Sequence, residues 1–332
     1  MLYQREKSGA EQNPVIQVAT AINIQHNTLN LLLPALVSVF TVSAVLSWLL
    51  ARVRGHWQVL DIPNERSLHS DPVPRTGGIA ILFGSGAGLL IAWYGQGHLL
   101  IAMPLGIAVI VLALVALIDD RHNLGAGIRL LAQFAAVSYL LLNSHMLDFG
   151  TPATIVALLF LVWMINLYNF MDGMDGFAGG MAIIGFGTYA ILGWQAGNLE
   201  FALGNAIVVS ACTGFLLFNF PPARIFMGDV GSTVLGLLAG ITILHSHRSG
   251  LLPVWFGILI FSPFIADASV TIAARIVRGE QFWKPHKSHC YQRLAQAGWG
   301  HRRTVLAEYG LMLACSGSAL SGATLPLNGQ VL

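Results

Sequence analysis

The feature that most constrains this chain is a series of long apolar stretches with few charges. A helix that crosses the hydrocarbon core of a bilayer needs about 20 such residues. Charged residues make up 10% of the chain, against roughly 25% in soluble proteins. The sequence therefore predicts an all-α, polytopic integral membrane protein. About ten transmembrane helices are expected, at 29–50, 77–94, 98–118, 128–147, 151–169, 177–194, 201–219, 232–246, 252–275 and 304–322.

The distribution of these stretches predicts a simple domain organisation. Residues 1–28 form a polar N-terminal tail, 29–322 a single transmembrane domain, and 323–332 a short C-terminal tail. The N-terminal tail has no apolar stretch after a basic start, so no cleaved signal peptide is expected. The 3 cysteines are scattered along the chain, and this pattern supports neither a disulfide framework nor a thiolate metal site.

Basic residues predict the orientation of the chain in the membrane. Alternate loops hold 14 of the 17 Lys and Arg residues, and loops rich in these residues face the cytoplasm. Most carboxylates fall on the same loops, so the chemically reactive groups are expected at the cytoplasmic surface. The formal net charge is only +2, and no nucleic-acid partner is expected.

Two adjacent carboxylates, Asp119 and Asp120, close the third apolar stretch. Neighbouring carboxylates repel each other unless a cation lies beside them. Two interpretations stay open from the residues alone. The pair is either a solvated helix end with Arg121 as its counter-ion, or part of a metal or phosphate site.

A second cluster of oxygen-bearing side chains recurs at three-residue intervals in NLYNFMDGMDGFAGG, namely Asn166, Asn169, Asp172 and Asp175. The two asparagines share one face of the fifth expected helix. Gly173 and Gly176 can release the chain from helical geometry and turn both carboxylates towards one centre. Oxygen ligands of this kind suit magnesium. A purely structural turn is the alternative, although buried polar groups without partners are costly.

A third candidate, Asp229, lies between Gly228 and Gly231 in FMGDVGS. Glycine permits a close approach of the backbone to a ligand. The free N–H groups of a helix expected to start at about Ser232 would favour an anion. The alternative is a tight turn between two helices.

The last long loop combines histidines with basic residues, including His286, Lys287, His289, Arg293 and His301. Such a set suits a clamp for pyrophosphate. Positive loops are also required by topology and touch anionic lipid, so both explanations stay open. Asp267 lies inside the ninth apolar stretch, and a structural pairing with Arg275 or another cation is the simplest expectation for it.

Taken together, these loops resemble the polyprenyl-phosphate N-acetylhexosamine-1-phosphate transferase superfamily, the glycosyltransferase family 4 type. The superfamily includes enzymes that start O-antigen, enterobacterial common antigen and teichoic acid linkage units, and the peptidoglycan translocase. The resemblance covers about 60–303. The family's Asp-x-Pro-Asn-x-Arg-x-x-His pattern, followed by Pro-x-x-Gly-Gly, fits the first loop at Asp61, Pro63, Asn64, Arg66, His69, Pro74, Gly77 and Gly78.

The resemblance implies a role for each motif residue. Catalytic roles are implied for Asp119, Asp120, Asp172, Asp175 and His289. Substrate binding is implied for Asn64, Arg66, His69, Arg129, Asn166, Asn169, His286, Lys287 and Arg293. Metal binding is implied for Asp229 and Asp175, with Mg²⁺ or Mn²⁺ as the ion.

The resemblance also implies a reaction and a location. The chain is expected to transfer an N-acetyl-amino-sugar 1-phosphate from a UDP-sugar to undecaprenyl phosphate, releasing UMP, as the first step of O-antigen or related cell-envelope polysaccharide synthesis. The expected location is the bacterial inner membrane, with the site facing the cytoplasm. The partners are the two substrates and the lipid bilayer, and a homodimer is compatible with this picture.

One departure bears on the sugar. The family's His-x-His-His element is reduced in this chain to His289, followed by Cys290, Tyr291 and Gln292. The segment PHKSHCYQRL is similar to the branch that begins lipopolysaccharide O-antigen chains with an N-acetylated amino sugar. This departure argues against the peptidoglycan alternative, a phospho-N-acetylmuramoyl-pentapeptide transferase.

Two other classes of membrane protein are rivals to this interpretation. A CDP-alcohol phosphotransferase needs a DGxxAR element, which is absent because Asp175 and Gly176 precede Phe177, Ala178 and Gly179. A cation-coupled transporter needs ionisable residues at mid-membrane. Asp267 is the one plausible candidate of that kind in the sequence.

Overall fold

The computed structural model describes residues 14–52, 59–61, 72–96, 103–144, 150–281 and 287–324. Side chains are described from residue 32 onwards within these ranges, except at 92–96. The first-loop candidates Asn64, Arg66 and His69, together with His286, lie outside the described residues.

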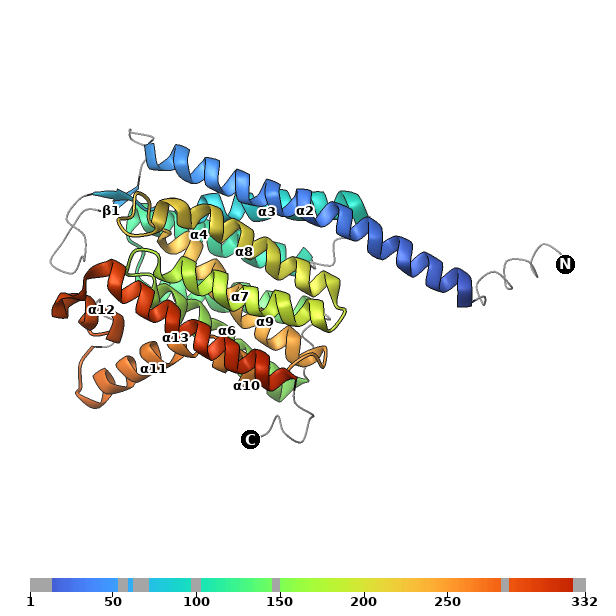
Figure 1. The fold of residues 1–332 in the computed structure, drawn as a ribbon. Helices are drawn as coiled ribbons and strands as arrows, with labels where there is room; N and C mark the ends of the chain where they lie inside the picture. Colours follow the sequence, from blue (N-terminus) through green and yellow to red (C-terminus); the bar gives the residue numbers. More distant parts are fainter. Residues whose placement is uncertain are drawn as a thin grey trace.

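The chain is a bundle of long helices lying side by side, with α2 extending past the others towards the N-terminus (Figure 1). The helices are α2 (Pro14–Arg52), α3 (Gly77–Gln96), α4 (Met103–His122), α5 (Ala126–Asn143), α6 (Thr151–Met171), α7 (Phe177–Gln195), α8 (Leu199–Asn219), α9 (Gly228–Arg248), α10 (Val254–Ile260), α11 (Ser262–Val277), α12 (Cys290–Leu294) and α13 (Gly300–Ala323), with a short π-helical segment at Ala295–Trp299. Strands β1 (Leu60–Asp61) and β2 (Val73–Pro74) pair antiparallel.

The polytopic, all-α prediction is confirmed. Seven of the described helices are long and apolar enough to cross a membrane, and α10 with α11 gives an eighth if the bent pair is one span. Each of the ten expected stretches coincides with a helix, but α3 has only a shorter apolar part and α13 is not among the candidate spans. The count of ten is therefore not confirmed. Helix α2 begins at Pro14, so the described part of the expected tail is helical.

The ninth expected span is broken. Helices α10 and α11 meet at Phe261 with a bend of 82°. Pro263 lies in the first turn of α11, where its missing N–H leaves no bond to α10. Helix α11 consequently leaves the bundle at an angle (Figure 1).

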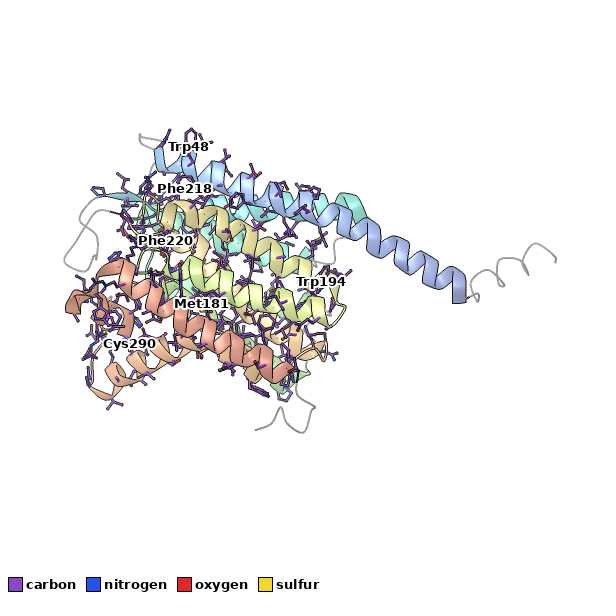
Figure 2. The ribbon with its side chains drawn as sticks, in the orientation of Figure 1. Trp48, Met181, Trp194, Phe218, Phe220 and Cys290 are labelled. Carbon is purple, nitrogen blue, oxygen red and sulfur yellow. The ribbon has the colours of Figure 1, made fainter. Side chains whose placement is uncertain are left out.

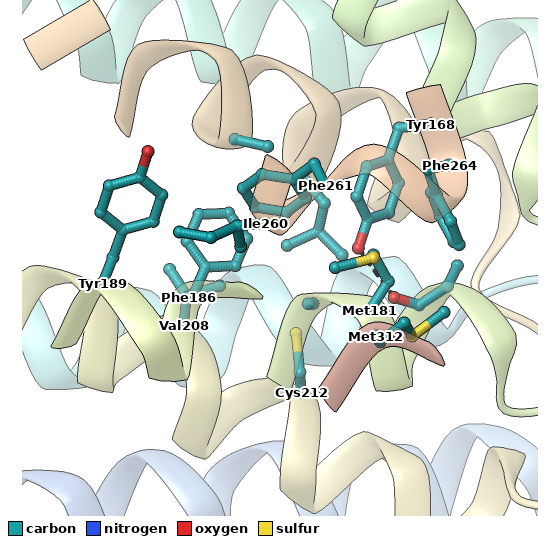
Figure 3. Close-up of a cluster of buried hydrophobic side chains, with 14 of the residues drawn as sticks. Tyr168, Met181, Phe186, Tyr189, Val208, Cys212, Ile260, Phe261, Phe264 and Met312 are labelled. Atoms are coloured by element: carbon teal, nitrogen blue, oxygen red, sulfur yellow. Dashed lines mark hydrogen bonds between the residues drawn. The ribbon is translucent and has the colours of Figure 1, made fainter. Parts of the chain in front are cut away.

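Aromatic and small side chains hold the bundle together. Tyr168 and Phe264 lie with ring centroids 5.1 Å apart, beside Phe261 and Met181 (Figure 3). Gly236 allows α9 to pack closely on α6, since a Cβ at this position would lie only 2.6 Å from the Met164 carbonyl oxygen. Small residues allow such close approach between membrane helices. This packing fixes the motif-bearing ends of α6 and α9 beside each other.

Tryptophans mark the two ends of the bundle. Trp48 lies near the end that also carries Cys290, and Trp194 lies at the opposite end (Figure 2). Both are partly exposed, and the Arg52 guanidinium lies 4.2 Å from the Trp48 ring centroid. Tryptophans in these positions are typical of the two membrane–water interfaces.

Candidate active site

The expected motif residues gather at one end of the bundle. Asp119 and Asp120 lie in the last turn of α4, Arg129 in the first turn of α5 and Asp229 in the first turn of α9. Arg75 lies between β2 and α3. We call these five residues the arginine–carboxylate cluster.

The two arginines of the cluster are shared among its carboxylates. Arg129 Nη1 lies 3.0 Å from Asp119 Oδ2 and 3.7 Å from Asp229 Oδ2. Arg75 Nη2 lies 3.5 Å from Asp120 Oδ1 and 3.5 Å from Asp229 Oδ1. Asp229 therefore lies between two cations, each of which also faces a carboxylate of α4.

Asn169 joins α6 to this cluster. Its Nδ2 donates to Asp229 Oδ1 at 3.0 Å and to Ser232 Oγ at 2.9 Å. Asn166, one turn away, instead donates to Gln133 Oε1 of α5 at 2.6 Å. The two asparagines share a face of α6 as expected, but they have different partners. Asn169 contacts a carboxylate of the cluster, whereas Asn166 links α5 to α6.

Glycines in FMGDVGS allow close backbone packing. Gly228 has a φ of +72°, and a Cβ there would lie 2.4 Å from the Arg75 carbonyl oxygen. The Gly78 N–H donates to the Met227 carbonyl at 2.8 Å. These contacts join the segment after β2 to the turn before α9, which places Arg75 beside Asp229. Helix α9 starts at Gly228, so the expected start at about Ser232 was wrong.

The carboxyl group of Asp172 lies in a strongly perturbed environment beyond the end of α6. Burial raises its pKa well above the usual value, and the nearby Asp229 and Asp120 add to the effect while Arg75 opposes it. Arg75 itself is partly buried, which alone would lower its pKa, but the facing Asp120 and Asp229 raise the pKa on balance. Arg75 therefore stays cationic beside a group of crowded carboxylates.

Asp175 has a separate set of contacts. Its Oδ1 is 3.0 Å from His301 Nδ1 of α13, and its Oδ2 accepts the backbone N–H of Ala223 at 3.0 Å. The adjacent Gly176 has a φ of +73° and donates to Asn219 Oδ1 at 3.0 Å. The glycine thus turns the chain as the sequence predicted, but Asp175 faces a histidine and a loop instead of the cluster around Asp229.

His289 faces Asp267. The His289 Nδ1 lies 3.4 Å from Asp267 Oδ1, and the backbone N–H groups of Cys290 and Tyr291 donate to the same carboxylate at 2.8 and 3.2 Å. Arg275, named with other cations as an expected partner of Asp267, instead lies 2.7 Å from Glu280. We call the Asp175–His301 and Asp267–His289 pairs the histidine–carboxylate contacts.

Two further candidates, Lys287 and Arg293, lie just before α12 and within it. The Arg293 side chain is exposed, and the Lys287 carbonyl accepts from the Gln296 side chain at 3.4 Å. Sequence reasoning did not assign roles to two residues that the structure places in these contacts, Arg75 and Gln133. His301 was expected as a member of a pyrophosphate clamp, but not as the partner of Asp175. Arg75 carried a signal, because it lies in a motif-bearing loop.

The chemistry of the cluster fits a divalent cation. Its carboxylates and the neighbouring Asn169 amide are hard oxygen ligands of the type that Mg²⁺ takes. Asp120 Oδ1 is buried and has no hydrogen bond, although Arg75 lies 3.5 Å away. Within the ranges that the structure describes, no three His, Cys, Asp or Glu side chains form a ready metal site. The arginines hold the carboxylates in this arrangement.

An apolar cleft starts beside this site. It has a volume of about 990 Å³ and is lined mainly by α3, α4, α8 and α9, from Gly78 and Gly231 to His245 and Ser249. Large apolar side chains at its edge, including Phe83 and Ile110, are exposed. Because the helices lie in a bilayer, this cleft offers an apolar path from the cluster along the bundle.

Comparison with known proteins gives matches over most of the chain. The sequence pattern of glycosyl transferase family 4 matches residues 102–247. A probable undecaprenyl-phosphate N-acetylglucosaminyl 1-phosphate transferase of Bacillus subtilis is 30% identical over 309 residues, 88% of this chain and 86% of the relative.

Two further relatives carry related names. The decaprenyl-phosphate N-acetylglucosaminephosphotransferase of Mycolicibacterium smegmatis is 30% identical, over 74% of this chain and 71% of the relative. The phospho-N-acetylmuramoyl-pentapeptide-transferase of Levilactobacillus brevis is 37% identical over 169 residues, 51% of this chain and 50% of the relative.

Proposed function

Because the chain belongs to glycosyl transferase family 4, we propose that it transfers a sugar 1-phosphate from a UDP-sugar to a polyprenyl phosphate in the membrane and releases UMP. The coarser part of this statement, a polyprenyl-phosphate sugar-1-phosphate transferase, follows from the relatives. The identity of the sugar, the metal and the residue roles are our own proposals.

The observation that carries the proposal is the arginine–carboxylate cluster at one end of a membrane bundle. Phosphoryl transfer depends mainly on positioning and on neutralising charge. Arg75 and Arg129 each lie between carboxylates from different helices. Such shared arginines suit phosphate oxygens, since a guanidinium binds them through two N–H groups.

We assign the metal to Asp229, with Asp175 as a second ligand. A bound Mg²⁺ or Mn²⁺ would neutralise charge on the pyrophosphate of the donor. For Asp175 to take part, its contacts with His301 and the Ala223 N–H must open. Asp120 and Asp172 supply further carboxylate oxygens on the same side, and both act on Arg75.

Asp119 is proposed to position the acceptor phosphate. Its Oδ1 accepts the Leu124 N–H and its Oδ2 pairs with Arg129, so the carboxylate is held in one orientation. A phosphate monoester has a second pKa of about 6 and is mostly dianionic at neutral pH. The acceptor therefore needs positioning at least as much as it needs a base.

The remaining candidates are proposed to bind the donor. His289 is assigned to the pyrophosphate, together with Lys287, Arg293 and His286, because cations and imidazoles stabilise developing negative charge. Asn166 and Asn169 shape the wall of the site from α6. First-loop residues Asn64, Arg66 and His69 are assigned to substrate by their motif positions.

For the substrate, we propose an N-acetylated amino sugar on UDP and undecaprenyl phosphate as acceptor, in O-antigen or related cell-envelope polysaccharide synthesis. The reduced His-x-His-His element at His289 supports this choice over the peptidoglycan substrate. The basic loops on the site's side support a cytoplasmic orientation in the bacterial inner membrane. The lipid bilayer surrounds the helix bundle that carries the site, and a homodimer stays compatible with these proposals.

The test is a transfer assay with purified protein in lipid vesicles. Undecaprenyl phosphate is incubated with a panel of UDP-N-acetyl amino sugars labelled in the sugar and in the β-phosphate. We expect both labels in the butanol-extractable lipid and UMP in the aqueous phase. Release of UDP with only the sugar label in lipid would show glycosyl transfer instead. No lipid product with any sugar of the panel would contradict the proposed reaction.

A further inference from the structure

Asp267 is a carboxylate inside α11 that the proposed mechanism does not use. Both of its oxygens face donors from the segment that carries His289. The backbone N–H groups of Cys290 and Tyr291 donate at 2.8 and 3.2 Å, and His289 Nδ1 lies at 3.4 Å. A third hydrogen bond to this carboxylate comes from α11 itself, where the Thr271 hydroxyl donates at 3.1 Å.

The bonds between Asp267 and two backbone N–H groups fix the start of α12. Two successive N–H groups at the start of α12 have no partner within that helix. A carboxylate placed there accepts from both of them. Asp267 therefore fixes the backbone of α12 to α11, whatever side chains follow His289.

Tyr291 carries this constraint to the motif turn between α6 and α7. The residue is fully buried, and its hydroxyl donates to the Phe170 carbonyl at 3.3 Å. A Cβ at Gly173 would lie 2.2 Å from the Tyr291 hydroxyl oxygen, so glycine is needed there. The ring of Phe177 lies 4.7 Å from that of Tyr291. The His289 segment thus packs directly on the turn that holds Asp172 and Asp175.

The orientation of His289 follows from the same contacts. Its side chain is buried and stacks on Tyr291, with ring centroids 5.9 Å apart and an interplanar angle of 17°. The backbone N–H of His289 donates to the Gln292 side chain at 3.3 Å, which fixes the main chain at this residue. With Nδ1 3.4 Å from Asp267 Oδ1, the imidazole packs against this carboxylate beside the turn.

We propose that Asp267 is a positioning residue, which holds the His289 segment against the Asp172–Asp175 turn and thereby orients His289 towards the donor. This proposal rests on the proposed function for its kinetic part. The structural part, the attachment of α12 to α11, stands independently of the reaction.

The first experiment compares Asp267→Asn with Thr271→Val. The amide keeps the size of Asp267 but loses its charge and one acceptor, whereas Thr271→Val removes a hydrogen bond to the same carboxylate without touching the loop. We expect Asp267→Asn to raise the KM for the UDP-sugar roughly 10-fold, by analogy with the lower end of the loss when a residue that orients a metal-binding histidine is replaced. The KM for polyprenyl phosphate should stay unchanged, and Thr271→Val should resemble the wild type.

A double-variant cycle separates positioning from a general loss of structure. If Asp267 acts through His289, Asp267→Asn combined with His289→Gln should have the donor KM of His289→Gln alone. Donor KM values for Asp267→Asn within twofold of the wild type would overturn the proposal. The proposal would also be overturned if the increases in donor KM caused by the two single substitutions multiplied in the double variant.

Hydrogen exchange tests the structural part without substrate. Amides of 290–294 should exchange faster in Asp267→Asn than in the wild type and in Thr271→Val, because the anchoring carboxylate is weakened. Unchanged exchange would overturn the inference even if the transferase reaction is confirmed. Faster exchange would support it even if the reaction assay fails, so the two failures are distinguishable.

Discussion

The arginine–carboxylate cluster and the histidine–carboxylate contacts differ in how their charges are satisfied. In the cluster, two arginines serve three carboxylates at 3.0 to 3.7 Å, and Asp229 faces both arginines. In the histidine–carboxylate contacts, Asp175 and Asp267 each have a histidine and at least one backbone N–H. A carboxylate that is bound by a backbone N–H group cannot change this partner unless the main chain moves.

This difference predicts different roles for the two regions. Side-chain ion pairs shared between helices can be rearranged around a phosphate or a cation, because Asp229 and both arginines each keep a second contact. Carboxylates bound to backbone N–H groups fix the position of loops. We therefore expect substitutions in the cluster to affect chemistry and metal response, and substitutions of Asp267 and His301, which contact His289 and Asp175, to affect mainly loop position.

The largest effect is expected for Asp229→Asn. The substitution removes the carboxylate that faces both arginines of the cluster, and with it the assigned metal ligand. We expect the transfer rate to fall by roughly 10²–10³-fold, as for loss of a group that stabilises transition-state charge. Initial rates at saturating substrates measure this. A rate close to wild type would remove Asp229 from the site.

Arg75→Gln tests a residue that motif reading alone did not assign. Without this guanidinium, Asp120 and Asp229 lose a shared cation and the phosphates lose a donor. We expect kcat/KM to fall on the order of 10–100-fold. Arg75→Lys should recover only part of the loss, because Lys keeps the charge but lacks the planar fork. Full recovery with Lys would show that charge alone is needed.

Asp119→Asn separates positioning from proton removal. The amide oxygen can still accept from Leu124, but the pairing with Arg129 is weakened. We expect a loss of about 10-fold or more that persists above pH 7, where the acceptor phosphate is already dianionic. A rate–pH profile measures this. Near-full activity at high pH would rule out an essential Asp119 charge.

His301→Gln should have a smaller effect on chemistry. His301 is a partner of Asp175, and Asp175 keeps the Ala223 N–H when the imidazole is lost. We expect a stability loss of about 1 kcal/mol from a disturbed, partly buried polar pair, with at most a several-fold change in rate. Thermal unfolding in detergent measures it, and Glu280→Gln, which alters the separate Arg275–Glu280 ion pair, is the control. A rate loss as large as that of Asp229→Asn would contradict the division of roles.

The smallest effect concerns pH and Asp172. Its pKa in the folded protein is raised, mainly by burial, so the folded state retains a proton that the unfolded chain loses. The contribution of Asp172 to the free energy of unfolding is therefore greatest at low pH. It is lost as the pH rises from the ordinary pKa of an aspartate, about 4, towards the raised pKa of Asp172 in the folded protein. Metal-free wild type should therefore lose thermal stability over this range more steeply than Asp172→Asn. Parallel pH profiles would exclude the effect.

The sequence predicted the helices and several of the side chains that meet, because hydrophobic length and motif spacing are local properties. Asp119, Asp229 and Asn169 were all expected at one surface, and the structure brings them together. The broken span at Phe261 could not be predicted from apolar length, which carries no information on direction. Partners such as Arg75 for Asp229 depend on how the segment after β2 packs on the turn before α9.

The same limit explains Asp267 and Asp175. Asp267 precedes several cations in the sequence, whereas Asp175 has none beside it. Their histidine partners are His289, at the start of α12, and His301 of α13. Tertiary packing determines which histidine or arginine of a loop becomes the partner of each carboxylate. The first loop, with Asn64, Arg66 and His69, keeps its motif-based prediction because it lies outside the described residues.

The most direct test of the division between the two regions is a magnesium titration of the initial transfer rate. Wild type, Asp229→Asn and Asp267→Asn are compared at saturating substrates. We predict that Asp229→Asn shifts half-saturation to at least about 10-fold higher Mg²⁺, whereas Asp267→Asn, which replaces a carboxylate of the histidine–carboxylate contacts that has no proposed metal role, keeps the wild-type value. An unchanged magnesium response in Asp229→Asn, or an equal shift in Asp267→Asn, would contradict the account.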